Sequence, residues 1–154
     1  NYFNRYRNLI KDTAQQVKYT SREELLHAMV GMKLVNVIRE EYPEIFDDEF
    51  IERIRHECEE AYKAEAKIIE WSVNGYESEY LSTPILQNFL KNRFNESLKE
   101  IGIDPVFTDV DDALLEKTEW FEEDVLGNAA TDFFHSRPVE YSKKDRCFDE
   151  SELF

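Results

Sequence analysis

A glutamate and a histidine three residues apart, Glu24 and His27, are the side chains of this sequence best placed to do chemistry together. They lie in an amphipathic stretch, and residues three apart on an α-helix share a face, so both can reach one cation. A carboxylate and an imidazole on one helix make up half of a di-metal carboxylate site. The spacing alone also fits a solvated glutamate beside a packed histidine, because the chain is rich in glutamate.

A long core helix over residues 11–41 is predicted to position this pair. Apolar side chains recur in it at helical spacing, and the first proline of the chain comes only afterwards, at Pro43. The positions expected to face the core are Val17, Leu25, Ala28, Met32, Val35 and Ile38.

Two further helices have start and stop signals of their own. The next helix is expected to start behind Asp47 or Asp48 as the N-cap and to run to about Val73. The third is expected to start at Thr83-Pro84, a capping hydroxyl followed by proline, and to stop at Gly102. Their inward positions are expected to be Phe50, Ile51, Ile54, Cys58, Ala61, Tyr62, Ile68 and Ile69 in one and Ile85, Leu86, Phe89, Phe94, Leu98 and Ile101 in the other.

The composition predicts one all-α domain, because the 154 residues include only four glycines and four prolines. The net charge of −15 argues against nucleic acid or an anionic membrane as a partner, since phosphates would be repelled. Two distant cysteines, Cys58 and Cys147, do not make a disulfide framework, so we expect a cytoplasmic protein. No segment reaches the roughly 18 apolar residues of a membrane span, and no signal peptide is visible.

The chain is predicted to divide into a helical part, residues 1–126, and an irregular tail, residues 127–154. Residues 1–10 are expected to lead into the first long helix, and a short helix is expected around Trp120. The tail has too few contiguous apolar residues to form a core, so it is either disordered or docked on a partner. Because the first residue is Asn1 rather than Met, we expect a leading segment that is either absent from this sequence or removed by processing.

Four stretches of the chain, in order, resemble the small, radical-generating subunit of class I ribonucleotide reductase. The first is Arg22-Glu23-Glu24-Leu25-Leu26-His27, followed by Gly31 and Ile38-Arg39-Glu40-Glu41-Tyr42-Pro43-Glu44. The others are Glu70-Trp71, then Asn128-Ala129-Ala130-Thr131-Asp132-Phe133-Phe134 with Pro138-Val139-Glu140-Tyr141, and finally Phe148-Asp149-Glu150-Ser151-Glu152-Leu153-Phe154. The collinear order makes the resemblance specific, because no single piece would suffice.

The resemblance implies a ferritin-like helical bundle in which four carboxylates and two histidines hold two metal ions, iron and/or manganese. Glu24 and His27 would be the last two ligands, with His27 bound as a neutral imidazole. The other ligands, and the radical-bearing tyrosine or its replacement, would come from an N-terminal half, either a separate chain or an upstream segment. This chain would then be the C-terminal half of the small subunit, unable to assemble the di-metal centre alone.

Two positions depart from the family pattern. Glu23 stands where the family usually has Asp, a carboxylate that orients a ligand histidine and belongs to the radical route. A surface glutamate without that role is the alternative. His135, six residues before Tyr141, stands where relatives often have Glu, and either accepts the proton released on tyrosine oxidation or is solvated. Tyr141 is expected to relay the radical between subunits, although an aromatic docking anchor is the other interpretation.

The acidic-aromatic terminus is expected, by the same resemblance, to dock on the large subunit, and a disordered end is the alternative. Its contact residues would be Phe148, Glu152, Leu153 and Phe154. A dimer of small subunits is the family expectation. Trp71 and Trp120 are expected to pack in the core or an interface rather than to relay a radical, and His56 to lie on an exposed helix face.

The predicted function is therefore that of a ribonucleotide reductase small subunit, an oxidoreductase component for deoxyribonucleotide synthesis and DNA replication. It would be active only with the missing N-terminal half and the large subunit. A ferritin-like metal-storage or oxidase protein is the alternative that the same Glu-x-x-His spacing allows. A third interpretation is a non-catalytic interaction module whose metal ligands are vestigial.

Overall fold

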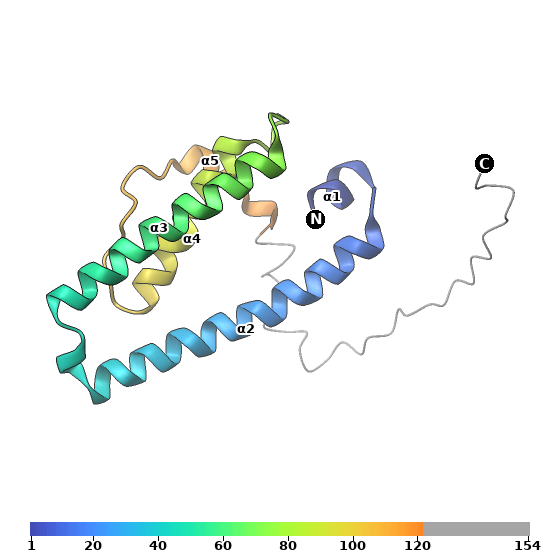
Figure 1. Ribbon diagram of the computed structural model, residues 1–154. Helices are drawn as coiled ribbons and strands as arrows, with labels where there is room; N and C mark the ends of the chain where they lie inside the picture. The colour runs from blue at the N-terminus through green and yellow to red at the C-terminus, as the bar shows by residue number, and fades with distance from the viewer. Residues whose placement is uncertain (122–154) are drawn as a thin grey trace, which may run out of the picture.

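The computed structural model describes residues 1–121, which are helical and contain no strand, so the all-α prediction is confirmed for this part of the chain (Figure 1). The helices, in order, are α1 (Tyr2–Arg7), α2 (Lys11–Glu41), the 3-10 helix η1 (Pro43–Ile45), α3 (Asp48–Val73), α4 (Thr83–Glu100) and α5 (Asp112–Glu116). Figure 1 shows α2 lying apart from the α3–α4 pair, to which the turn at η1 joins it. None of the helices within residues 1–121 is long and apolar enough to cross a membrane.

The ends of the long helices follow local capping signals. Asp47 caps α3 by accepting a hydrogen bond from the Phe50 N–H at 2.8 Å, as predicted. The cap of α4 is Ser82 and not Thr83, because the Ser82 hydroxyl accepts from the Ile85 N–H at 3.5 Å and Thr83 is already helical. Gly102 follows the end of α4 with φ of +71°, a left-handed conformation that favours glycine.

The core lies between α3 and α4. Cys58, Leu98 and Ile103 are buried at its centre. Cys58 of α3 and Leu98 of α4 were predicted to face inward, and this prediction is confirmed. Partly buried side chains that pack around them are Ile51, Ile54, Phe94, Ile101, Val106 and Phe107. Ala61 and Ile68 of α3 are exposed, so their prediction as inward positions was wrong within this chain.

Two buried asparagines tie an extended segment to α4. The Asn95 amide donates to the Phe107 carbonyl and accepts from the N–H groups of Val106 and Phe107. Two turns earlier on the same helix, Asn88 exchanges two hydrogen bonds with the backbone of Asp111. In both asparagines the amide nitrogen donates and the amide oxygen accepts, which offsets the cost of burying them, so this pairing fixes the path of the chain towards α5.

Within residues 1–121, the prediction that α2 is a core helix was wrong, because Ala14 is the only buried residue of this helix. Its C-terminal part is held by polar contacts to the end of α4. The Asn36 amide donates to the Glu100 carbonyl at 2.8 Å, and the Arg39 guanidinium donates to the carbonyls of Ile101 and Gly102. These contacts satisfy carbonyls that a helix end otherwise leaves unpaired. Among the predicted inward positions of α2, Val17 and Ala28 are exposed, and the half-buried ones are Leu25, Met32, Val35 and Ile38.

Candidate metal centre

Glu24 and His27 share one face near the middle of α2. The Glu24 Oε2 and His27 Nδ1 atoms lie 3.7 Å apart, and the two side chains are 69% and 75% exposed. The helix that carries them begins at Lys11 and runs without a break to Glu41, so the pair is positioned by a rigid element. The structure therefore brings together the two predicted ligands and leaves them open to solvent.

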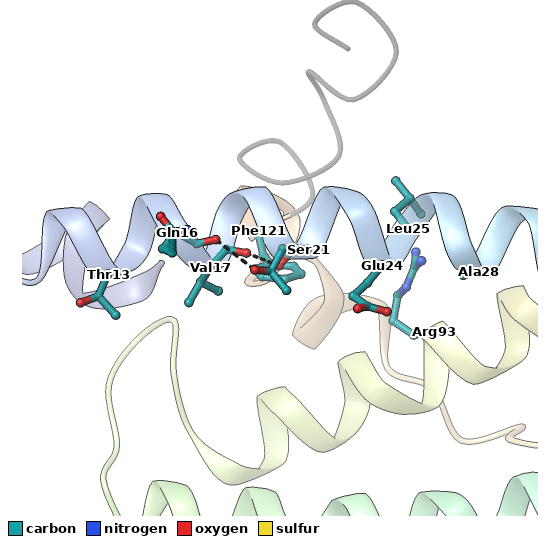
Figure 2. A pocket seen from close by; sticks show the side chains of 10 residues that line it. Thr13, Gln16, Val17, Ser21, Glu24, Leu25, Ala28, Arg93 and Phe121 are labelled. Carbon is teal, nitrogen blue, oxygen red and sulfur yellow. Dashed lines mark hydrogen bonds between the residues drawn. The ribbon is translucent and has the colours of Figure 1, made fainter. Parts of the chain in front are cut away.

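Glu24 points into a groove of about 590 Å³ that runs along α2 (Figure 2). The opposite wall includes Arg93 of α4 and Phe121. The α2 wall is formed by Thr13, Gln16, Val17, Thr20, Ser21, Glu24, Leu25 and Ala28. The hydroxyl of Ser21 donates to the Val17 carbonyl at 2.8 Å, so this polar group is satisfied within the helix. Glu24 and Arg93 are therefore the charged side chains of an otherwise neutral groove.

A second groove of about 530 Å³ continues along α2 and shares Ala28 with the first. It lies between Gly31, Met32 and Val35 of α2 and the side chains of α3 and α4 that surround Cys58 and Leu98. Burial raises the pKa of the Cys58 thiol, so this side chain behaves as an apolar group rather than a thiolate ligand. A Cβ atom added at Gly31 would meet nothing within 4 Å, so no described side chain contacts α2 at this position.

The donors at this site fit half of a di-metal carboxylate centre. A carboxylate oxygen and an imidazole nitrogen are suitable ligands for iron or manganese. No group of three or more His, Cys, Asp or Glu side chains within residues 1–121 is placed to hold a metal ion. Glu24 and His27 can therefore contribute to a shared metal site but cannot complete one with the described residues alone.

The other predicted functional residues fall into two groups. Glu23 is exposed on α2, next to Glu24 in sequence but turned to a different side of the helix. The predicted relay and docking residues lie outside the described residues; they are His135, Tyr141, Phe148, Glu152, Leu153 and Phe154.

The two tryptophans have different environments. Trp71 is 81% exposed at the end of α3, so core packing is ruled out within the described chain and the interface interpretation remains. Trp120 packs against Tyr2, Tyr6 and Phe121, as predicted for a structural role. His56 lies on an exposed face of α3, as expected.

Sequence reasoning missed an aromatic cluster that joins α1 to the loop before α4. Tyr6 and Tyr80 stack with ring centroids 4.9 Å apart, and the Tyr2 hydroxyl donates to the Ser78 hydroxyl at 2.9 Å. The adjacent Tyr2 hydroxyl and the Arg7 guanidinium, which donates to the Tyr76 hydroxyl at 3.4 Å, lower the pKa of Tyr76 at the edge of this cluster. The sequence feature that could have indicated this cluster is the high tyrosine content of residues 1–10 and 76–80. Local periodicity does not predict contacts between segments that lie so far apart in sequence.

Comparisons with known proteins place the chain in a family. The family model described as "Ribonucleotide reductase, small chain" matches residues 2–113. The chain is 27% identical over 121 residues to ribonucleoside-diphosphate reductase subunit beta of Aquifex aeolicus (strain VF5), which covers 76% of this chain and 16% of that protein. It is 26% identical over 136 residues to the protein of the same name from Chlamydia pneumoniae, which covers 87% of this chain and 37% of that protein. The chain thus spans well under two thirds of the length of these relatives.

Proposed function

The chain belongs to the ribonucleotide reductase small-chain family, and on this premise we propose that it is the C-terminal half of a small subunit. In this role Glu24 and His27 are two of the ligands of a di-metal centre. The remaining ligands come from a complementary N-terminal half, on a separate chain or an upstream segment. The complete subunit generates or stores the radical that a large subunit uses to reduce ribonucleotides to deoxyribonucleotides.

The observation that carries the proposal is the pairing of Glu24 and His27 on an uncovered helix. Their closest atoms lie 3.7 Å apart, and both side chains are mostly exposed. One carboxylate and one imidazole leave the coordination of a metal ion incomplete, so further ligands, and partners that orient them, have to come from outside the described residues. The groove that Glu24 lines is open, and the described residues place no third ligand beside the pair.

Iron or manganese, when bound, supplies the oxidising chemistry of such a centre. Glu24 gives a hard anionic oxygen, and His27 binds as a neutral imidazole. Glu23 orients a ligand histidine and belongs to the route by which the radical leaves the centre. Tyr141 then relays the radical to the large subunit, with His135 accepting the phenolic proton.

The proposal is tested by the metal content of the assembly. The chain is co-expressed with the N-terminal half of a family member, and the iron and manganese of the purified complex are measured by mass spectrometry. His27→Ala should lower the retained metal about tenfold or more. His56→Ala is the matched control, since His56 is an exposed histidine on α3 and should leave metal content unchanged. If His27→Ala complexes form normally and keep their full metal content, the ligand assignment fails.

A further inference from the structure

Arg39, close to the C-terminal end of α2, joins this helix to the end of α4. Its guanidinium donates to the carbonyls of Ile101 and Gly102, the second at 3.0 Å. The same group lies over the Phe46 ring at the end of η1, 5.7 Å from the ring centroid. A cation at the C-terminal end of a helix interacts favourably with the helix dipole and with carbonyls that have no partner inside the helix. Arg39 therefore connects α2, η1 and α4 at one point.

Gly102 allows the guanidinium to lie directly against the turn after α4. A Cβ atom built on Gly102 would overlap the Arg39 guanidinium, so no other residue fits here without moving Arg39. The φ of +71° at Gly102 favours glycine as well. One turn of α2 earlier, the Asn36 amide donates to the Glu100 carbonyl at 2.8 Å. The contacts of Arg39 and Asn36 with residues 100–102, here called the Arg39 latch, thus set the distance between α2 and α4 at this end.

The other end of α2 is attached through α1, which comes directly before it in the chain. The Tyr2 hydroxyl of α1 donates to the Ser78 hydroxyl, and the aromatic cluster described above packs around the Tyr2 ring. Between these two attachments the middle of α2 carries Glu24 and His27, both mostly exposed. Figure 2 shows Glu24 on the side of α2 that faces α4, across the first groove. The two attachments therefore fix where this pair lies relative to α4.

We propose that Arg39 is a positioning residue for the metal ligands, because the Arg39 latch holds α2 at the angle to α4 at which Glu24 and His27 reach the shared ions. The proposal rests on the proposed function for the identity of the two ligands. Glu24 lies roughly 20 Å along the helix from Lys11, so a tilt of about 5° about that end moves its carboxylate by about 2 Å. A metal site requires its side chains to be held within about 0.5 Å of the productive geometry. Loss of the latch would therefore disturb the site, although Arg39 lies about three helical turns from His27.

The remainder of the fold does not depend on Arg39. The core between α3 and α4 is built from apolar side chains around Cys58 and Leu98, and the α1 cluster lies at the opposite end of α2. Water can reach the carbonyls at the end of α4, since Glu100 and Gly102 are exposed, so these carbonyls keep hydrogen-bond partners when the guanidinium is removed. Substitution of Arg39 should therefore change the position of α2 and leave the helical fold in place.

The position of α2 is measured directly with two spin labels on the full chain, assembled with the N-terminal half. Lys33→Cys on α2 and Lys67→Cys on α3 place the labels at exposed positions, in a Cys147→Ser background. Cys58 is buried and stays unlabelled. In double electron–electron resonance, Arg39→Ala should shift or broaden the distribution of distances between the labels by about 2 Å or more. An unchanged distribution overturns the proposal.

Metal affinity is measured on the same assemblies, without labels, by titration with Mn²⁺. Arg39→Ala should weaken Mn²⁺ binding about tenfold or more, while the urea midpoint of unfolding changes little. Arg39→Lys should recover part of the affinity, because an ammonium keeps the charge but lacks the planar fork of donors of a guanidinium. Arg53→Ala is the matched control, since it removes an exposed arginine from α3 and should change neither the distance nor the affinity.

Gly102→Ala tests the contact itself, because its Cβ atom displaces the guanidinium. It should weaken Mn²⁺ binding by a similar factor when Arg39 is present but add little in the Arg39→Ala background. Additive effects of the two substitutions, or a shifted distance with unchanged affinity, overturn the proposal and leave the ligand assignment standing. A failed His27→Ala metal test would instead overturn the ligand assignment, while the distance measurement would still show whether Arg39 holds α2 in place.

Discussion

Asn95 and Phe107 exchange two hydrogen bonds: the asparagine amide donates to the Phe107 carbonyl at 2.7 Å, and its oxygen accepts from the Phe107 N–H at 3.1 Å. The same oxygen also accepts from the Val106 N–H at 3.1 Å. The buried Asn95 side chain thus takes the place of the water molecules that would otherwise form hydrogen bonds with this extended backbone. The segment between α4 and α5 is held in place by this buried amide together with the buried Ile103 side chain.

Asn95→Ala should therefore destabilise the helical part of the chain. The substitution leaves two backbone N–H groups and a carbonyl without partners in a buried place, at a cost of about 1–3 kcal/mol in the free energy of unfolding. Urea unfolding followed by circular dichroism measures the loss. Asn92→Ala, at a half-exposed position of the same helix, should stay within about 0.5 kcal/mol of the wild type. Equal effects of the two substitutions would contradict the assigned role of Asn95.

The helix limits could be predicted because they depend on short-range signals. Asp47 and Gly102 act through their own and neighbouring backbone groups, so the sequence around each is sufficient. Ser82 was missed in favour of Thr83 because two adjacent hydroxyls offer the same capping chemistry, and the backbone conformation alone decides between them. Asn95 was missed because its partners come from a later, extended segment without periodicity.

Burial on α2 could not be predicted from this sequence. Val17 and Leu25 have the spacing of core residues, but they become buried only if another element lies against them. The described chain supplies no such element along most of α2. The same reason applies to the candidate site. The spacing of Glu24 and His27 predicts that they share one helix face, but the other ligands would come from outside the described residues and cannot be predicted from this spacing.

Trp71→Ala should weaken assembly with the N-terminal half while leaving the stability of the chain nearly unchanged. The side chain is 81% exposed, so its removal should change the free energy of unfolding of the chain by no more than about 0.5 kcal/mol. If Trp71 anchors an interface, the same substitution should weaken binding to the N-terminal half by about 2 kcal/mol or more, since buried tryptophans are typical hot spots. Calorimetric titration gives the affinity. Trp120→Ala is the contrast. Because the Trp120 ring packs against Tyr6, its removal should lower the free energy of unfolding of the chain.

The Lys91–Asp109 ion pair should give a small pH dependence of stability. A hydrogen bond from the Lys91 ammonium lowers the pKa of Asp109 from its ordinary value of 3.8. Because the folded pKa is the lower one, the stabilisation is present above the ordinary pKa and is lost as the pH falls through the lowered pKa. Asp109 is largely exposed, so the effect should be below about 1 kcal/mol. The stability difference between wild type and Asp109→Asn should therefore shrink on acidification; a difference that grows would contradict this assignment.

Glu23 should affect radical delivery more than metal retention. Glu23→Gln keeps the length of the side chain but removes its charge, so a proton-coupled route through this carboxylate should slow by about tenfold or more while the bound metal changes little. Glu23→Asp, which restores the usual family residue, should retain the activity of the assembly. Turnover with the large subunit and metal content of the same preparations give the two readouts. Equal activity of the Gln and Asp variants would show that Glu23 is a surface residue without this role.

Deletion of residues 148–154 should separate the ribonucleotide reductase proposal from a ferritin-like storage or oxidase function. These residues lie outside the described part of the chain, and they end in the apolar pair Leu153-Phe154 beside Glu152. A short peptide of this kind gains affinity by burying its aromatic and aliphatic side chains in a groove of its partner. The truncated subunit, assembled with its N-terminal half, should keep its metal but lose binding to the large subunit in a surface-plasmon-resonance assay. Substituting Cys147 by Ser is the control, since it leaves the terminal peptide intact and should preserve binding. Undiminished binding after the deletion would contradict the docking role of these residues, and an intact subunit that does not bind the large subunit would favour the storage or oxidase function.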